Sequence, residues 1–368
     1  FLVVIVFRKR ILVESFFMIS WFIWTIISSS IVDPYLFNES YFPPVFRFAT
    51  ISVFLFFLFN SINIQYSAND GFKAIWLGGL IILILTIGSG GVQAASSLYG
   101  ERIGTDIMWN ANDYAYMLLI STFSIIYFLA SGRSVQIRLL NSLFLLLITG
   151  LIILSASRKA FLTEVVFILG SFVIGYFFEV RKRLVSILMK ASFIIAFVIT
   201  TSFLLTNTYL GERLGELWTK EVESRTFDER FLHRGRYYVE ALDVIREFPI
   251  MGVGLDNFKY YDKWREPAHS DFVAVITETG IVGFLLYFCA YAVIIGRLIK
   301  SLHSVQRSEE RRQISFQLLI VASILLMALA RWNYNHPLTN IILATIGRIS
   351  YERQGRTNEI RNRRYLVK

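Results

Sequence analysis

Long apolar blocks without polar stripes dominate the chain. In the segment IWLGGLIILILTIG (75–88), for example, no polar residue recurs at the 3.6-residue spacing of a helix that faces water. The blocks are about 17 to 25 residues long, which is the length an α-helix needs to cross about 30 Å of hydrocarbon. The pattern therefore predicts an all-α, polytopic bundle of transmembrane helices.

The blocks predict about ten spans along the chain. They lie at residues 11–31, 45–60, 73–92, 113–131, 139–155, 159–179, 184–206, 271–296, 314–332 and 337–351. The opening residues FLVVIVF are interpreted as the end of one further, truncated span. The chain then divides into transmembrane helices over 1–206, one large loop over 207–270, transmembrane helices over 271–351, and a basic cytoplasmic tail over 352–368.

Composition and charge fit a membrane protein better than a nucleic-acid-binding one. Hydrophobic residues make up 55% of the 368 residues, charged residues make up 17%, and the net charge is +10. The Lys and Arg residues concentrate in alternate connections, as the positive-inside rule requires of cytoplasmic loops. These basic stretches are 8–10, 132–138, 181–183, 297–313 and the tail. The charge therefore predicts orientation, and we expect no nucleic-acid partner.

Five other connections are predicted to face outward, and one of them is much longer than a turn. They comprise residues 32–44, 93–112, 156–158, 207–270 and 333–336. In the long loop, YYVEALDVIREF (237–248) has an apolar face at helical spacing. This face comprises Tyr238, Ala241, Leu242, Ile245 and Phe248. Pro249 is expected to end this amphipathic helix.

The segment GVG (252–254) follows that helix and has the spacing of a nucleotide-binding turn. A dinucleotide fingerprint, however, follows a buried strand and opens a helix in a βαβ unit. Here the glycines follow a helix, in an outward loop. We expect them to allow a tight turn and a close backbone approach instead.

Four segments resemble one family of membrane proteins. They are NANDYAYMLL (110–119), LSASRKAFL (154–162), HRGRYYVEALDVIREFPIMGVGLDNF (233–258) and HSDFVAVITETGIVGFLLY (269–287). The last contains a Glu-x-Gly-x-x-Gly motif at Glu278, Gly280 and Gly283. Their order and spacing resemble the O-antigen ligase and polysaccharide polymerase (Wzy-type) family of integral membrane glycosyltransferases.

The resemblance implies an activity and its partners. Members of this family transfer a glycan from an undecaprenyl diphosphate carrier, either to another lipid-linked repeat unit or to a lipid A core. The implied location is the bacterial cytoplasmic (inner) membrane, with the active site on its outer, periplasmic face. A chain-length regulator and a flippase are the expected protein partners. No cofactor or metal is expected, and the sequence contains no Asp-x-Asp motif.

Three arginines are candidates for binding the diphosphate. Arginine suits this task because its planar group binds phosphate oxygens in a bidentate manner and keeps its charge. Arg158 lies in a very short outward connection, although snorkelling at a helix end is the alternative explanation, and a better one for Lys159. Arg236 matches the family's Gly-Arg, and Arg234 precedes it at the start of the amphipathic helix. Helix N-termini favour phosphate, while an ordinary solvated charge is the alternative.

The candidate base is His269, because neutral imidazole accepts a proton near physiological pH. The family places a histidine here, usually as His-Asn, whereas this chain has His-Ser-Asp. Asp271 orients the imidazole, acts as the base itself, or caps the following helix. His233 and Glu278 are further possible site residues, and Glu278 is either paired with a cation or functional. In the connection near His336, Trp332 and Tyr334 are typical of an interfacial aromatic belt.

The favoured prediction is an inverting, metal-independent polymerase of lipid-linked repeat units, and a ligase is the alternative. A transporter or flippase of lipid-linked sugars is a more remote alternative. Transporters usually show internal repeats and charged residues deep within spans, and no repeat is visible here.

Overall fold

The computed structural model describes most of the predicted helices. The described residues are 12–32, 44–61, 68–89, 102–108, 110–131, 134–178, 238–262, 270–329 and 336–366, with residues 195, 198, 199, 201, 202, 210, 268 and 334. The regular secondary structure in these residues consists of helices, with no strand, which confirms the all-α prediction for this part of the chain. Residues 1–7 and most of the span predicted at 184–206 lie outside it.

Nine long helices coincide with nine predicted spans within the described residues. They are α2 (Val13–Val32), α3 (Pro44–Ser61), α4 (Ala68–Gly88), α7 (Ala111–Ser131), α8 (Val135–Leu154), α9 (Arg158–Phe178), α14 (Asp271–Ser304), α15 (Ser308–Ala328) and α16 (Pro337–Leu366). Two short helices, α6 (Thr105–Met108) and α13 (Phe258–Tyr261), lie in connections. α16 runs without a break through the boundary predicted at residue 351.

Five of the described helices are long and apolar enough to cross a membrane by length and composition. They are α2, α4 from Gly71, α8, α14 and α15. Many of their large apolar side chains are exposed, for example Phe16, Leu85 and Leu143. Such side chains have no reason to face water, but they suit contact with lipid. The chain is thus a multi-pass helical membrane protein.

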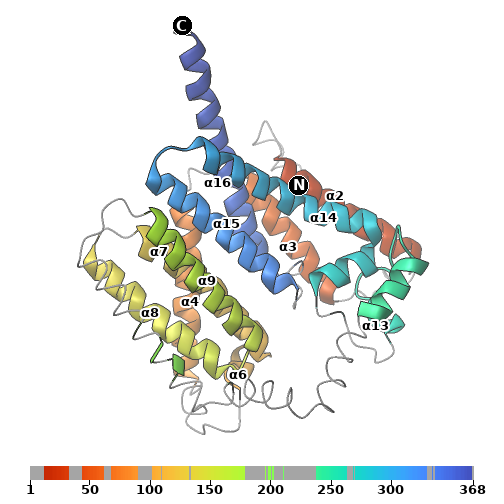
Figure 1. Cartoon of the computed structure of the whole chain (residues 1–368). Coiled ribbons are helices and arrows are strands. Elements are labelled where there is room, and N and C mark those ends of the chain that lie inside the picture. The colour runs from red at the N-terminus through yellow and green to blue at the C-terminus, as the bar shows by residue number, and fades with distance from the viewer. Residues whose placement is uncertain are drawn as a thin grey trace. The chain divides into compact units, whose positions relative to one another are not determined.

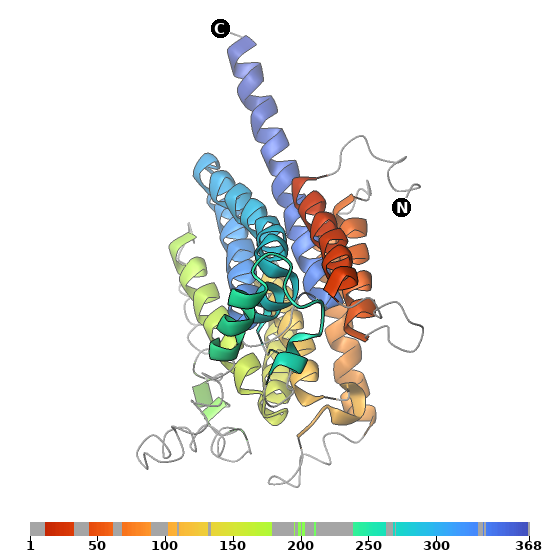
Figure 2. The same ribbon diagram turned by 90° about the vertical axis from the view of Figure 1, so that its right-hand side faces the viewer.

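The chain forms two compact units. The first contains residues 1–68, 228–305 and 324–368, and its helices α2, α14, α16 and α3 form a ring in which each packs against two others. Figures 1 and 2 show α16 running beside α3, and Figure 1 shows α2 along α14. Trp21 is fully buried between these helices, with its ring centroid 5.1 Å from that of Tyr287.

A buried ion pair joins α2 to α14 near one end of the first unit. Arg297 Nη1 donates to Glu14 Oε2 at 2.6 Å, and the Glu14 side chain has no solvent exposure. The Arg297 guanidinium also lies 5.4 Å from the ring centroid of Tyr351 on α16. Buried charges need such partners because desolvation of a lone ion is costly. Arg297 on α14 therefore contacts both α2 and α16.

The second unit contains residues 69–227 and 306–323, and in it α7 packs against α6, α8 and α9. The carboxyl of Glu164 on α9 is fully buried within this unit. Glu164 Oε1 accepts hydrogen bonds from Thr122 Oγ1 at 3.1 Å and from Thr149 Oγ1 at 2.9 Å. The three helices thus meet around one polar contact, which the apolar pattern of the sequence did not predict.

Candidate functional site

Helix α14 is interrupted one third of the way along, at Gly280. This residue has φ 67° and ψ −175°, which is far from helical. The Ile281 N–H donates to Pro249 O at 2.9 Å, and so it does not continue the helical hydrogen bonding to Thr277. Such a break leaves backbone carbonyls without their usual donors, and buried carbonyls need replacements.

The Gly-x-Gly segment supplies those replacements. The Val253 N–H donates to Thr277 O at 2.9 Å, and the Gly254 N–H donates to Glu278 O, also at 2.9 Å. Trp24 on α2 donates its indole N–H to Thr279 O at 2.8 Å. All three consecutive carbonyls therefore have a donor. The Gly-x-Gly motif and the Glu-x-Gly-x-x-Gly motif are the two halves of one backbone contact.

Bare backbone is required on both sides of this contact. A Cβ on Gly252 would lie 2.5 Å from Glu278 C, and one on Gly280 would lie 2.0 Å from Ile250 O. Both glycines also have positive φ, at 70° and 67°. The close backbone approach expected of these glycines is confirmed, and it leaves no room for a dinucleotide between the two segments.

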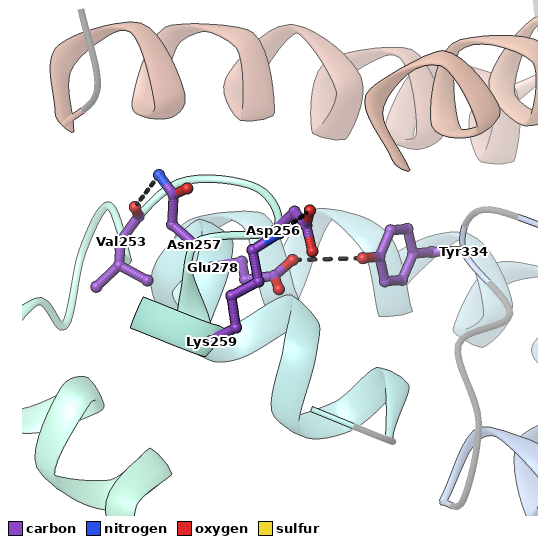
Figure 3. Close-up of polar contacts among 6 residues, drawn as sticks. All are labelled: Val253, Asp256, Asn257, Lys259, Glu278 and Tyr334. Carbon is purple, nitrogen blue, oxygen red and sulfur yellow. Dashed lines mark hydrogen bonds and ion pairs between the residues drawn. The ribbon is translucent and has the colours of Figure 1, made fainter. Parts of the chain in front are cut away.

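A group of ionisable side chains lies beside the break (Figure 3). Glu278 is 1% exposed, and its Oε2 accepts a hydrogen bond from Tyr334 Oη at 3.3 Å. Lys259 Nζ donates to Asp256 Oδ2 at 2.7 Å. Burial lowers the pKa of Lys259, but the hydrogen bond and charge of Asp256 outweigh that effect and raise it. The negative charge of Glu278 also raises the pKa of Lys259, so Lys259 interacts electrostatically with both carboxyl groups.

Tyr334 lies in the core of the first unit, so the interfacial aromatic belt expected for it is wrong. Its side chain is buried, and its ring centroid lies 5.9 Å from that of Trp21. Burial, followed by the negative charges of Glu278, Asp271 and Asp256, raises the pKa of Tyr334 well above its usual value. The belt was inferred from position alone, whereas the hydroxyl finds a carboxyl partner inside the bundle.

Asp271 is the first residue of α14, and the N-cap is Ser270. The Asp271 side chain is fully buried, and its Oδ1 accepts the backbone N–H of Tyr334 at 3.3 Å. The Ser270 hydroxyl donates to Ala328 O at 3.2 Å. The carboxyl of Asp271 therefore joins the 329–336 connection to the start of α14, and the helix dipole favours a negative charge there.

The amphipathic helix is present over residues 238–247 and is followed by Pro249, as predicted. Its buried stripe is narrower than expected. Ala241 and Val244 are buried, whereas Tyr238 and Leu242 are about half exposed, at 53% and 51%. Phe248, which follows this helix, contacts Tyr261 with ring centroids 5.6 Å apart. The helix thus packs through its small residues and leaves its larger ones outside.

Of the predicted diphosphate-binding residues, the structure describes Arg158, which lies in the second unit. It is the first residue of α9 and is half-buried, and residues 155–157 separate it from the end of α8. Ala156 in this short connection has φ 54°, a left-handed conformation that is uncommon for a residue with a Cβ. The first turn of α9 contains Arg158 and Lys159 and no acidic residue. This order reverses the usual preference for anions at a helix N-terminus.

Sequence reasoning missed Arg102, which contacts two of the motifs. Its Nε donates to Ser155 O at 2.9 Å, and its Nη2 donates to Asn112 Oδ1 at 2.7 Å. Ser155 belongs to the Ser-x-Ser-Arg segment, and Asn112 belongs to the Asn-rich segment. A lone arginine in a loop carries no distinctive sequence signal, and only folding brings it to both motifs.

His233, Arg234, Arg236 and His269 lie outside the described residues. The roles expected of them therefore stay predictions. Described residues flank them on the chain: the helix at 238–247 follows the arginines, while Ala268 and Ser270, both buried, enclose His269 in the sequence.

The fold and these motifs define an integral membrane protein with a helical bundle and a motif-bearing loop. Residues 143–288 match the family described as O-antigen ligase, which confirms the resemblance found in the motifs. This part of the chain is thus similar to a domain of that family. The match runs from α8 through the long loop to the middle of α14, so it includes the broken helix and Arg158. No curated protein matches the chain.

Proposed function

We propose that the protein polymerises undecaprenyl-diphosphate-linked oligosaccharide repeat units at the outer face of the bacterial cytoplasmic membrane. The observation that carries the proposal is the family match over 143–288, which contains the arginine-bearing N-terminus of α9. A helix N-terminus that presents two cations in its first turn suits a diphosphate ligand. The repeat units belong to an O-antigen, a capsule or an exopolysaccharide.

The proposed reaction is an inverting glycosyl transfer without a metal. A hydroxyl oxygen of the acceptor sugar attacks the anomeric carbon of the donor glycan. The bond from that carbon to the diphosphate oxygen breaks, and undecaprenyl diphosphate leaves with the bonding electrons. The hydroxyl proton passes to His269. Arg158, Arg236 and Arg234 stabilise the charge that develops on the leaving diphosphate, in place of a divalent cation.

Asp271 and Glu278 support this site. Asp271 is the first residue of α14, and Glu278 lies in the first third of the same helix. Asp271 is two residues from His269 in the chain, and it orients the imidazole or accepts the proton itself. The Glu278 carbonyl accepts the Gly254 N–H, and the Glu278 carboxyl accepts the Tyr334 hydroxyl, so this residue holds both groups on α14. His233 adjoins the arginine pair and is a possible contact to the glycan.

A ligase is the second candidate, because the matching family is described as O-antigen ligase. Both activities use the same donor and the same chemistry, and they differ in the acceptor. Purified protein is therefore incubated with a lipid-linked repeat unit alone, and then together with a lipid A core. A ladder of products from the repeat unit alone supports the polymerase. A product that forms only with the core supports the ligase, and no transfer in either mixture refutes both.

A further inference from the structure

We propose that Arg102 is a positioning residue of the diphosphate site, which holds the α8–α9 connection in the conformation from which Arg158 extends. This inference rests on the proposed function, because it gives Arg102 a role only through Arg158. It assigns a task to a residue of the second unit that lies outside every motif discussed above.

The contacts of Arg102 fix the end of α8. Its Nε donates to Ser155 O at 2.9 Å, and the next residue, Ile103, donates its N–H to Leu154 O at 3.4 Å. These are carbonyls of the last residues of a helix, which lack donors from a following turn. A cation is also favoured at a helix C-terminus, where the dipole is negative. Arg102 therefore stabilises this particular end of α8.

The connection held in this way is short, buried and strained. Ser155 has no solvent exposure, Ala156 is 1% exposed and Ser157 is 3% exposed. The left-handed φ of Ala156 needs support from its surroundings, because it is unfavourable for a residue with a Cβ. A connection of three residues transmits any change in this conformation directly to Arg158. A small shift of the guanidinium then changes its distance to a bound diphosphate.

Arg102 is itself held in place by α7. Its Nη2 donates to Asn112 Oδ1 at 2.7 Å, and the Asn112 N–H donates to Asn110 Oδ1 at 2.8 Å. Gly104, two residues after Arg102, lies so close to Tyr114 on α7 that a Cβ at this glycine would be 2.2 Å from Tyr114 Cγ. Arg102 therefore links Asn112 on α7 to the α8–α9 connection through two short hydrogen bonds.

Arginine suits this position better than lysine. Its rigid fork donates from Nε and Nη2 at the same time, toward a backbone carbonyl and a side-chain amide. A lysine ammonium keeps the charge, but its flexible stem does not fix two such partners in one geometry. A positive charge alone is thus insufficient to hold both partners of Arg102. A lysine at this position therefore distinguishes a positioning role from general electrostatic attraction.

The test is a cycle of variants with purified full-length protein and a lipid-linked repeat unit. Arg102→Gln is expected to lower kcat/KM by about 100-fold, as small misplacements of catalytic groups do. In an Arg158→Lys background, the same change is expected to lower it by less than about 3-fold, because residues that act as a unit are not additive. Arg102→Lys is expected to resemble Arg102→Gln, and Arg246→Gln is the matched exposed control. For variants with turnover below detection, the affinity for undecaprenyl diphosphate in detergent micelles replaces kcat/KM.

The outcomes separate this inference from the proposed function. Equal losses from Arg102→Gln in both backgrounds overturn the positioning role, because Arg102 then acts independently of Arg158. Full activity of Arg102→Lys, or a fall in melting temperature that accounts for the lost activity, also overturns it. If Arg158→Gln is inactive while Arg102→Gln equals wild type, the inference alone fails. If Arg158→Gln is fully active, the proposed function fails.

Discussion

The backbone N–H of Gly254 donates to the carbonyl of Glu278 at 2.9 Å, and this bond joins two motifs that lie 24 residues apart in the chain. It exists because Gly280 interrupts α14 and frees the carbonyls just before it. The loop that contains Gly254 is thereby fixed on the helix that also begins with Asp271. These glycines bring the 252–254 segment against α14 through backbone hydrogen bonds.

Alanine at the two facing glycines is expected to destabilise the first unit. Gly252→Ala and Gly280→Ala each place a methyl group within 2.5 Å of backbone atoms and at a positive φ. The expected loss is about 2–4 kcal/mol for each, from strain and overpacking. Thermal unfolding in detergent measures it. Gly296→Ala in the same helix meets nothing within 4 Å and is the control, with an expected gain of about 0.5–1 kcal/mol. Equal stability of all three variants contradicts the backbone contact.

Alkaline pH is expected to weaken the fold through Tyr334. Its pKa is raised in the folded protein, so the stabilising difference is fully present below the ordinary value of 10.0 and is lost as pH rises beyond it. The raised pKa of Lys259 acts in the same direction above its ordinary value of 10.5. These two groups are therefore expected to make the melting temperature fall as pH rises beyond about 10.

The Tyr334→Phe variant isolates the tyrosine contribution. It removes the hydroxyl that donates to Glu278, at a cost of about 1–3 kcal/mol near neutral pH. It also removes one titrating group, so its melting temperature is expected to fall less steeply above pH 10. An alkaline slope identical to that of the wild type shows that Tyr334 titrates with its usual pKa.

Substitution of the proposed site residues is expected to abolish chain elongation without changing protein level. Arg158→Ala, Arg236→Ala and His269→Ala each remove one part of the proposed chemistry, and loss of the base alone costs about 100- to 10,000-fold. Arg158→Lys is expected to rescue poorly, because a point charge lacks the fork geometry. Gel analysis of glycan length measures the effect, with Arg246→Ala as the control. Normal length distributions in all three variants refute the site assignment.

The predicted orientation is tested with single cysteines. Cys289→Ser removes the one natural thiol. Cysteine is then placed at Tyr260, which is 55% exposed in the loop predicted to face outward, or at Arg307, 84% exposed in a connection predicted to face inward. A membrane-impermeant maleimide is expected to label position 260 in intact cells and position 307 only after permeabilisation. The reverse pattern places the loop on the cytoplasmic side and refutes a periplasmic site.

Some features of the site had a sequence signal and others had none. The short α8–α9 connection, Pro249 and the close approach of the glycines follow from local chemistry, and each was predicted. Tyr334 was misplaced because an aromatic residue near a span end looks the same whether it faces the interface or the core. Arg102 and Glu164 gave no signal, because a single polar residue carries no periodicity. Their most distant hydrogen-bond partners lie 53 and 42 residues away.

The sequence by itself determined that the chain crosses a membrane and where its helices lie. Apolar runs and helix-ending residues act locally, so their consequences are visible in a linear pattern. It also indicated the family that residues 143–288 match, because motif order is a property of the chain. Only the tertiary structure decided what the motifs contact. The glycines predicted a close backbone approach, but the folded chain alone shows that the partner is the interrupted helix α14. That contact joins segments 24 residues apart, and a linear pattern does not show which distant segments meet.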